Sequence, residues 1–181
     1  MAPLKNRTSN RLKNYDYSSP GYYFVTMCTH NQVCLFGEIK NNVMVLNEYG
    51  KIVQAAWEDL SNHYTDVQLD EFIVMPNHVH GIIWLIDLKT NVDVGAGLKP
   101  APTWRFGLSE IVRGFKTFSS RRINVSRKTP GIIVWQRSFY DHIIRDEIKL
   151  NKIREYIMNN PAQWAMDDGG REEGAEHCSA M

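Results

Sequence analysis

The stretch "VQLDEFIVMPNHVHGIIWLID", residues 67–87, contains two apolar runs separated by the pair Pro76-Asn77. Proline and asparagine are typical turn residues, and both runs are rich in β-branched and aromatic side chains. The stretch therefore predicts two strands joined by a turn at Pro76-Asn77. Because alternate side chains of a strand point to the same face, we expect His78 and His80 to point together, with Val79 on the other face.

The rest of the chain predicts further strands and helices around this pair. The patterns indicate strands at 21–29, 41–47 and 132–144, and helices at 47–64, 109–122 and 145–161. The resulting order, β, β, α, β, β, α, β, α, lacks the regular alternation of a doubly wound parallel sheet. It predicts an α+β sandwich in which helices pack on a largely antiparallel sheet.

Three details of the helices follow from local rules. Asn47 is the expected N-cap of the first helix, and Pro161 is expected to end the last one. The second helix is expected to bury one apolar face and to point its basic residues outward. The residues of that apolar face are Ile111, Val112, Phe115 and Phe118.

Length and composition favour one globular domain. The chain has 181 residues, of which 43% are hydrophobic and 23% charged. Its longest apolar stretch, Gly81 to Ile86, is far short of the roughly 20 residues that cross a bilayer. The first residues lack the apolar core and cleavage site of a secretory signal. We therefore expect a cytoplasmic protein without a membrane partner.

The charges are unevenly distributed although the net charge is only +1. Residues 167–181 carry five acids and one base, which leaves 20 bases against 15 acids in the rest of the chain. Bases gather in residues 1–19 and 105–128, where they indicate either solvated surface or contact with a phosphate backbone. We expect a basic N-terminal arm at 1–19, a folded domain at 20–164 and a disordered acidic tail at 165–181.

The two histidines of the opening stretch could bind a metal. Neutral imidazole is a common ligand for divalent cations, but two nitrogens leave a site incomplete, so a third ligand must come from elsewhere in the fold. A strand near the end of a sheet also carries such a pair by chance. The pattern alone leaves both interpretations open.

The predicted last helix adds two polar side chains. Tyr156 and Asn160 are four residues apart, so they lie on the same face of a helix. In the alternative interpretation, Tyr156 packs in the core with Ile153 and Ile157, and Asn160 caps the helix end.

Three blocks of the sequence, "MPNHVHGIIWL", "VWQRSFYDHIIRDE" and "NKIREYIMNNPAQW", resemble in order and spacing the REP-associated tyrosine transposases. These form a branch of the single-tyrosine HUH transposases of small bacterial insertion sequences, the IS200-like family. The resemblance runs from about Asn10 to Trp164 and implies a ferredoxin-like fold. It also implies that His78, His80 and Asn160 bind the metal and that Tyr156 is the nucleophile. Asparagine at the third ligand position is typical of the REP-associated branch.

The activity implied by the resemblance is cleavage and rejoining of single-stranded DNA at hairpin-bearing repeats. It implies Mg²⁺ or Mn²⁺ as cofactor and a covalent 5′-phosphotyrosine intermediate. Hairpin DNA is the implied partner, and the resemblance leaves open whether the protein forms a homodimer. The candidate DNA-binding residues are Arg11, Lys13, Arg113, Lys116, Arg121, Arg122, Arg137 and His142.

Two other functions remain open from the sequence. One is a non-catalytic or domesticated protein that binds DNA hairpins. The other is a metal-dependent hydrolase in which His78 and His80 activate water, although no carboxylate obviously completes such a site.

Overall fold

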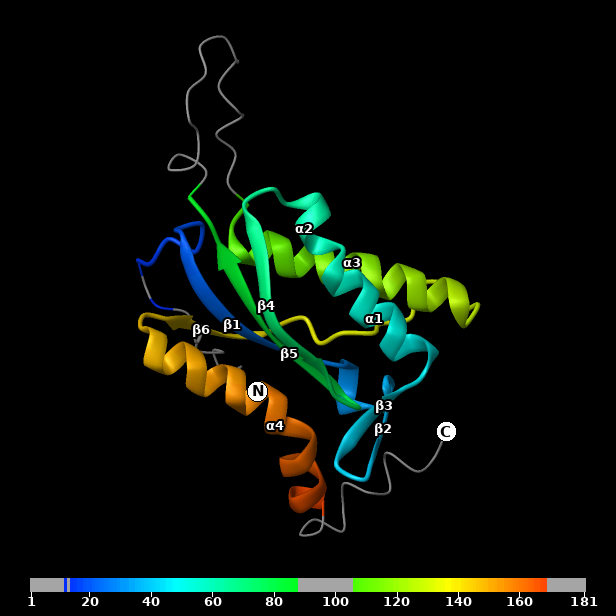
Figure 1. Ribbon diagram of the computed structural model, residues 1–181. Coiled ribbons are helices and arrows are strands. Elements are labelled where there is room, and N and C mark those ends of the chain that lie inside the picture. Colours follow the sequence, from blue (N-terminus) through cyan, green and yellow to red (C-terminus); the bar gives the residue numbers. More distant parts are fainter. Residues whose placement is uncertain (1–11, 13, 88–105, 169–181) are drawn as a thin grey trace, which may run out of the picture.

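A four-stranded antiparallel sheet forms the centre of the protein. The computed structural model describes residue 12 and residues 14–87 and 106–168. The strand order is β4 (Val67–Val74), β5 (His78–Leu85), β1 (Gly21–Cys28) and β6 (Tyr140–Ile144), and every neighbouring pair is antiparallel (Figure 1). The predicted α+β class, with helices on an antiparallel sheet, is confirmed.

The hairpin of β4 and β5 turns at Pro76-Asn77, as the sequence predicts. The amide of Met75 donates to the carbonyl oxygen of His78 at 2.8 Å, which closes the turn. The carbonyl of Pro76 accepts from the amides of Leu35 and Phe36, at 2.8 and 3.0 Å. These bonds fix the end of the sheet at which β5 begins, and His78 is the first residue of β5.

A second, two-stranded sheet consists of β2 (Gly37–Lys40) and β3 (Val43–Leu46), preceded by the short η1 (His30–Gln32). It leads into α1 (Glu48–Glu58), where the side chain of Asn47 accepts from the amide of Gly50 at 3.0 Å. The predicted N-cap is therefore confirmed. The helix predicted at 47–64 is divided at Asp59 into α1 and α2 (Leu60–His63).

The main core lies between one face of the sheet and the helices α1 and α3 (Leu108–Ser126). Val53 and Trp57 of α1 and Ile111 and Phe115 of α3 are buried against strand residues such as Val25. Phe118 is 40% exposed, so its predicted inward position is wrong. Its ring stacks on the imidazole of His63 instead, with 5.3 Å between centroids.

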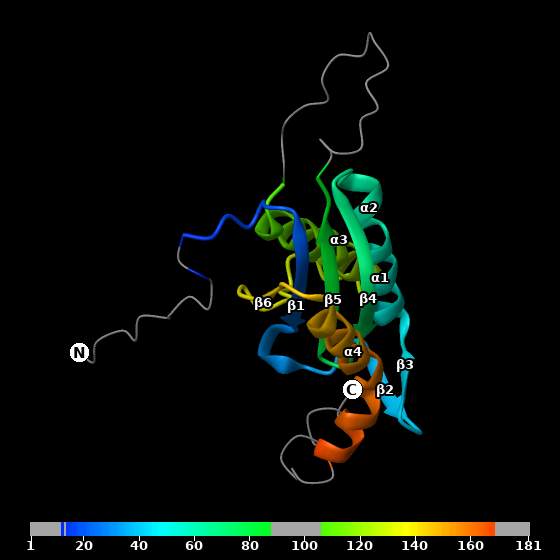
Figure 2. The same cartoon turned by 60° about the vertical axis from the view of Figure 1, so that its left-hand side comes forward.

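The other face of the sheet is covered by α4 (Glu147–Asp168) (Figure 2). A smaller cluster with Phe24, Ile82, Ile144, Leu150 and Ile157 fills this layer. The sandwich therefore carries α1 and α3 on one face and a single long helix on the other.

The prediction that Pro161 ends this helix is wrong. Proline inside a helix removes one hydrogen bond and costs about 3 kcal/mol. In α4, Pro161 is buried, and the helix continues far enough to bring the ring of Trp164 to 5.6 Å from that of His78. Contacts with the sheet thus favour the continued helix, which extends into the segment predicted as a tail. Residues 169–181 of that tail, and most of the predicted arm, lie outside the described residues.

The prediction of a strand at 132–144 is also wrong for the first half of that range. Only Tyr140–Ile144 pairs with the sheet as β6, and Trp135 forms a single bridge with Thr29. Side-chain Nζ of Lys116 donates to the carbonyls of Gln136 and Ser138, at 2.8 and 2.9 Å. Other backbone bonds of this segment reach the end of β1 and η1, where the amide of Gln136 donates to the carbonyl of Cys28 at 2.9 Å and the amide of His30 donates to the carbonyl of Val134 at 2.8 Å. Within the described ranges, no helix is both long and apolar enough to cross a bilayer.

Candidate active site

His78 and His80 meet on the face of the sheet that α4 covers. Their Nε2 atoms lie 3.0 Å apart, and their ring centroids are 4.6 Å apart. His80 is buried and His78 is half-buried. The alternation of strand β5 therefore brings the two imidazoles together, as expected from their spacing.

Nδ1 of each imidazole forms a hydrogen bond that holds the ring in place. Nδ1 of His78 lies 2.7 Å from Oδ1 of Asn77, and Nδ1 of His80 lies 2.8 Å from Oγ1 of Thr26 on the neighbouring strand β1. Because an amide oxygen only accepts, Nδ1 of His78 carries a proton and Nε2 presents its lone pair. This tautomer is the one a metal ligand requires.

Both imidazoles are neutral at physiological pH. Burial lowers the pKa of His78 to about 4, although its hydrogen bond with Asn160 opposes the shift. Burial also lowers the pKa of His80 to about 3, and the neighbouring His78 lowers it further. A neutral imidazole has one nitrogen with a free lone pair, which is the form that binds a metal.

Tyr156 of α4 approaches this point from the helix side. Its hydroxyl lies 3.4 Å from Nε2 of His80, and the two ring centroids are 5.3 Å apart. The side chain is 41% exposed, whereas Ile157 beside it is 1% exposed. The alternative interpretation, in which Tyr156 packs in the core, is therefore wrong.

Asn160 lies one helical turn after Tyr156 and is buried, with 7% exposure. Its side chain is hydrogen-bonded to His78. Since α4 continues past this position, Asn160 is not a helix cap. Trp164, one further turn along the same face, contacts His78, and sequence reasoning missed it. Extending the four-residue spacing of Tyr156 and Asn160 by one step would have indicated it.

An ion pair ties this helix to the edge strand β4. The guanidinium of Arg154 donates from Nε to Oδ1 of Asp70 at 2.8 Å, and from Nη2 to Oδ2. This hydrogen bonding holds the pKa of Asp70 below its ordinary value. Asp70 lies where the pairing of β4 with β5 shifts register. Since Arg154 lies two residues before Tyr156, the ion pair fixes α4 close to Tyr156. No local pattern in the sequence indicates this ion pair.

The donor set fits a divalent cation. Two nitrogens bound to one cation at about 2.1 Å and at right angles to each other would lie about 3.0 Å apart. The observed Nε2 separation matches that value. Among the described residues, no group of three or more His, Cys, Asp or Glu side chains could hold a metal. A site here would therefore use the amide oxygen of Asn160 as its third protein ligand.

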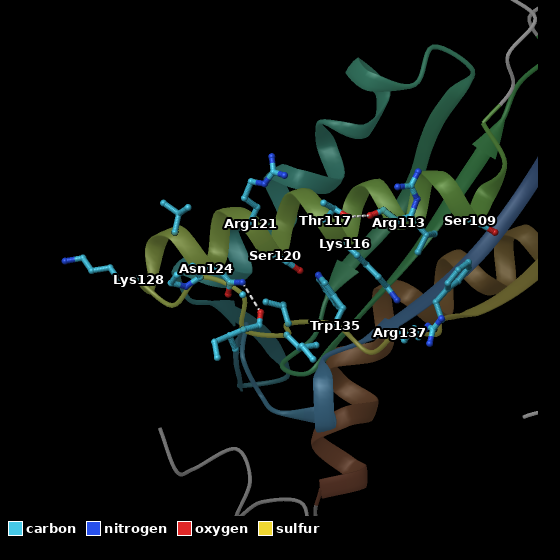
Figure 3. A pocket seen from close by; sticks show the side chains of 18 residues that line it. Ser109, Arg113, Lys116, Thr117, Ser120, Arg121, Asn124, Lys128, Trp135 and Arg137 are labelled. Atoms are coloured by element: carbon cyan, nitrogen blue, oxygen red, sulfur yellow. Dashed lines mark hydrogen bonds between the residues drawn. The ribbon is translucent and has the colours of Figure 1, made fainter. Parts of the chain in front are cut away.

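Several of the predicted DNA-binding residues line a groove on the other side of the sheet. The groove has a volume of about 1070 Å³ and lies between α3 and the segment 130–139 (Figure 3). No acid lines it within the described part of the chain. Its basic residues are Arg113, Lys116, Arg121, Lys128 and Arg137.

Lys116 differs from the other bases of this groove. Its Nζ is turned inward to the carbonyls of Gln136 and Ser138, and burial lowers the pKa of Lys116 to about 8. The prediction that all bases of this helix point outward is therefore wrong for Lys116.

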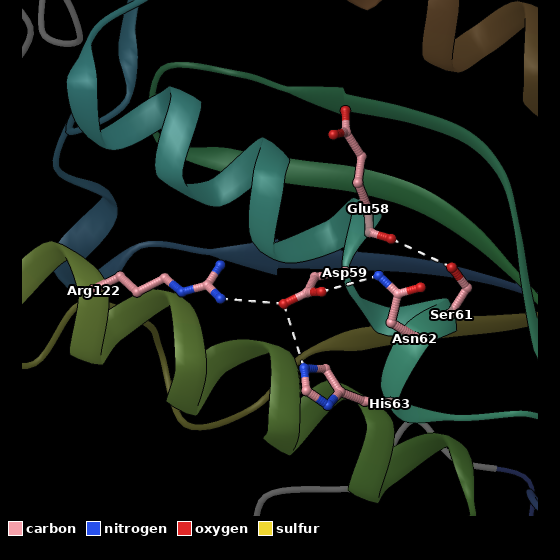
Figure 4. A network of polar contacts seen from close by, with 6 residues as sticks. All are labelled: Glu58, Asp59, Ser61, Asn62, His63 and Arg122. Atoms are coloured by element: carbon pink, nitrogen blue, oxygen red, sulfur yellow. Dashed lines mark hydrogen bonds and ion pairs between the residues drawn. The ribbon is translucent and has the colours of Figure 1, made fainter.

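Arg122 lies on a different face of α3 from the groove. It forms an ion pair with Asp59 at 3.1 Å, and Asp59 also contacts Asn62 and His63 (Figure 4). This network joins α3 to the junction of α1 and α2. His142 is exposed on β6, on the same face as His80. Arg11 and Lys13 lie outside the described residues.

Comparisons with known proteins bear on this arrangement. No family model matches the sequence. A Haemophilus influenzae protein named "Uncharacterized protein" is 41% identical over 169 residues, which cover 92% of this chain and 94% of that protein. A second protein of the same organism, named "Putative REP-associated tyrosine transposase", is 22% identical over 154 residues, or 84% of this chain and 77% of that protein.

Among solved structures, a REP-associated tyrosine transposase bound to a REP hairpin has a similar fold. The alignment covers 86% of this chain and 74% of the transposase chain. The TM-score is 0.57 and the sequence identity is 16%. The fold is therefore that of a tyrosine transposase. Both the sequence and the fold are thus similar to those of REP-associated tyrosine transposases, a branch of the IS200-like family. The resemblance found in the sequence is confirmed, and these similarities support a transposase-like function.

Proposed function

We propose that the protein cleaves and rejoins single-stranded DNA at hairpin-bearing repeats, with Tyr156 as nucleophile and a divalent metal held by His78, His80 and Asn160. One observation carries the proposal. The hydroxyl of Tyr156 lies 3.4 Å from the same Nε2 of His80 that faces Nε2 of His78 at 3.0 Å. A nucleophile and a ligand pair thus converge on one point.

The ligand set suits Mg²⁺ or Mn²⁺, and the 3.0 Å separation of the two nitrogens supports this assignment. When bound, such a cation would neutralise charge on a phosphate oxygen and favour in-line attack at phosphorus. The protein side chains supply the rest. The low pKa values of His78 and His80 keep both imidazoles neutral, so that each ring has one nitrogen with a free lone pair, and the bonds with Asn77 and Thr26 fix the orientation of the rings.

Tyr156 performs the covalent step. Its phenolic oxygen forms a bond to phosphorus while the bond from phosphorus to the 3′ oxygen breaks. The phenol loses one proton and the departing 3′ oxygen gains one, so a free 3′ hydroxyl and a 5′-phosphotyrosine result. Attack by another 3′ hydroxyl on this ester reverses the step and joins strands without an external energy source. The half-exposed position of Tyr156 leaves its hydroxyl open to a substrate.

The groove beside α3 supports binding of DNA. Its exposed basic residues can neutralise phosphates, and the exposed apolar side chains of Ile132 and Ile133 can contact nucleobases. The REP-associated tyrosine transposase of similar fold is bound to a REP hairpin. We therefore propose hairpin-bearing single-stranded DNA as the partner of this chain.

The test is the formation of a covalent adduct. Wild-type protein is incubated with Mn²⁺ and end-labelled single-stranded hairpin DNA, and the products are separated under denaturing conditions. We expect a protein-linked label that is lost with Tyr156→Phe, with His80→Ala and with a chelator. Tyr64→Phe, which removes a hydroxyl on the opposite side of the sheet, serves as the control and keeps the adduct.

Two results would contradict the proposal. Cleavage that survives Tyr156→Phe would indicate a hydrolase that uses His78 and His80 to activate water. Tight hairpin binding without cleavage in any metal would indicate a non-catalytic binding protein. The position of the groove on the side of the sheet away from Tyr156 is the observation that favours this second function.

A further inference from the structure

Among the described residues, strand β6 is an edge strand of the sheet, and it lies beside the candidate active site. It pairs with β1 on one side and ends the strand order on the other (Figure 2). Tyr140 and His142 alternate along it with the buried Asp141 and the half-buried Ile143. Directly opposite residues of an antiparallel pair share a face. Tyr140 is opposite Thr26 and His142 is opposite Phe24, so both side chains lie on the face that holds the histidine pair.

Tyr140 occupies the same row of the sheet as His80. Thr26 pairs with Tyr140 on one side and with His80 on the other, and its hydroxyl bonds Nδ1 of His80. Adjacent strands are about 4.8 Å apart, so the backbone of Tyr140 lies roughly 10 Å from that of His80. Tyr140 is thus a neighbour of the site and not a distant surface residue.

The ring of Phe24 connects Tyr140 to the site. Its centroid lies 5.4 Å from that of His80, 6.2 Å from that of Tyr156 and 6.3 Å from that of Tyr140. Phe24 is 8% exposed, whereas Tyr140 is 46% exposed. Aromatic rings therefore continue without interruption from the reactive centre to the edge of the sheet, and the last ring faces solvent.

We propose that Tyr140 is a stacking platform for the nucleobase that adjoins the scissile phosphate. An exposed ring beside a phosphate-binding centre fits a flat, apolar base, and stacking on such a ring is tolerant of base identity. His142, the next side chain on this face, lies where it can donate to a backbone phosphate. The inference rests on the proposed function, because it gives the DNA strand its path into the same site.

The test uses full-length protein carrying Tyr156→Phe, so that binding is measured without cleavage. Single-stranded hairpin DNA carries the fluorescent base 2-aminopurine at successive positions on both sides of the cleaved bond, which is mapped with wild-type protein. Stacking quenches this base. We expect strong quenching at one position next to that bond, and its loss with Tyr140→Ala but not with Tyr140→Phe.

Affinity gives a second readout. Tyr140→Ala should weaken binding about 5- to 100-fold, the range found for removal of one base-stacking ring. An abasic nucleotide at the quenched position should weaken wild-type binding equally and abolish the effect of Tyr140→Ala. Phe118→Ala, which removes an aromatic ring of similar exposure on α3, is the matched control and should leave the quenching unchanged. Thermal melting of each variant separates these effects from loss of fold.

The outcomes distinguish the inference from the proposed function. If the wild-type protein binds no hairpin DNA, the proposed function fails and the inference fails with it. If hairpin DNA binds and is cleaved, but quenching is the same with Tyr140→Ala or occurs only far from the cleaved bond, the inference alone is overturned.

Discussion

The ring centroids of Trp164 and His78 lie 5.6 Å apart, and Trp164 lies two helical turns beyond Tyr156 on α4. With Tyr156 and Asn160 it completes a face of α4 that contacts both histidines. Trp164 therefore restricts the ring of His78 and holds the end of the helix against the sheet beyond Pro161.

Replacing this indole should reduce activity more than stability. We expect Trp164→Ala to lower the rate of adduct formation about 10- to 100-fold, because small displacements of a ligand or nucleophile are costly in catalysis. The neighbouring Gln163 is exposed, so Gln163→Ala is the matched control and should keep the wild-type rate. Equal rates for the two variants would show that Trp164 does not position the site.

The sequence predicts those parts of the protein that depend on local rules. The turn at Pro76-Asn77, the common face of His78 and His80, and the cap at Asn47 follow from residue type and spacing, and the structure contains all three. The shared helical face of Tyr156 and Asn160 belongs to the same class.

Other features depend on partners far away in the sequence. Pro161 should end a helix by local rules, but the contact between Trp164 and His78 favours its continuation. Residues 132–139 have the composition of a strand, yet the carbonyls of Gln136 and Ser138 are bound by Lys116 from α3. The bond of Thr26 to His80 spans 54 positions and the pair of Arg154 with Asp70 spans 84, so no local pattern could indicate either.

Thr26 should be needed for activity although it is no ligand. Its hydroxyl bonds Nδ1 of His80 at 2.8 Å and thereby orients Nε2. Removing such a partner of a ligating histidine typically costs 10- to 100-fold in metal affinity or activity. We expect Thr26→Val to require about that much more Mn²⁺ for half-maximal adduct formation. Thr65→Val, at an exposed position just before β4, is the control and should leave the Mn²⁺ requirement unchanged.

The ion pair of Asp70 and Arg154 should give a stability that depends on pH. Because Arg154 lowers the pKa of Asp70 in the folded protein, the stabilisation is complete above the ordinary carboxyl pKa of about 3.9. It is lost as the pH falls through the lower pKa of the folded state. We expect Asp70→Asn to reduce the free energy of unfolding by about 1–2 kcal/mol at pH 7.

Urea denaturation at several pH values measures this effect. The difference between wild type and Asp70→Asn should be constant above about pH 5 and should shrink below about pH 4. Glu71→Gln, a change of the adjacent carboxylate, is the control and should cost less. A difference that grows toward acidic pH would contradict the assignment.

Arg121 and Arg122 provide a matched test of the groove. Arg121 lines the groove beside α3, whereas Arg122 is engaged with Asp59. Arg121→Gln should weaken binding of hairpin DNA and reduce the slope of log affinity against log salt by about 1, the effect of one lost phosphate contact. Arg122→Gln should leave that slope unchanged. Equal slopes for the two variants would exclude the groove as the phosphate-binding surface.

A single chain should contain a complete active site. The hydroxyl of Tyr156 reaches His80 of its own chain at 3.4 Å, and Arg154 fixes the same helix to β4 of that chain. Tyr156→Phe and His80→Ala proteins should therefore remain inactive when mixed, because neither chain holds both groups. If α4 were exchanged between two copies, a mixed dimer would combine the intact tyrosine of one chain with the intact histidines of the other. Recovery of adduct in the mixture, measured across protein concentrations, would show that Tyr156 acts on the partner's site.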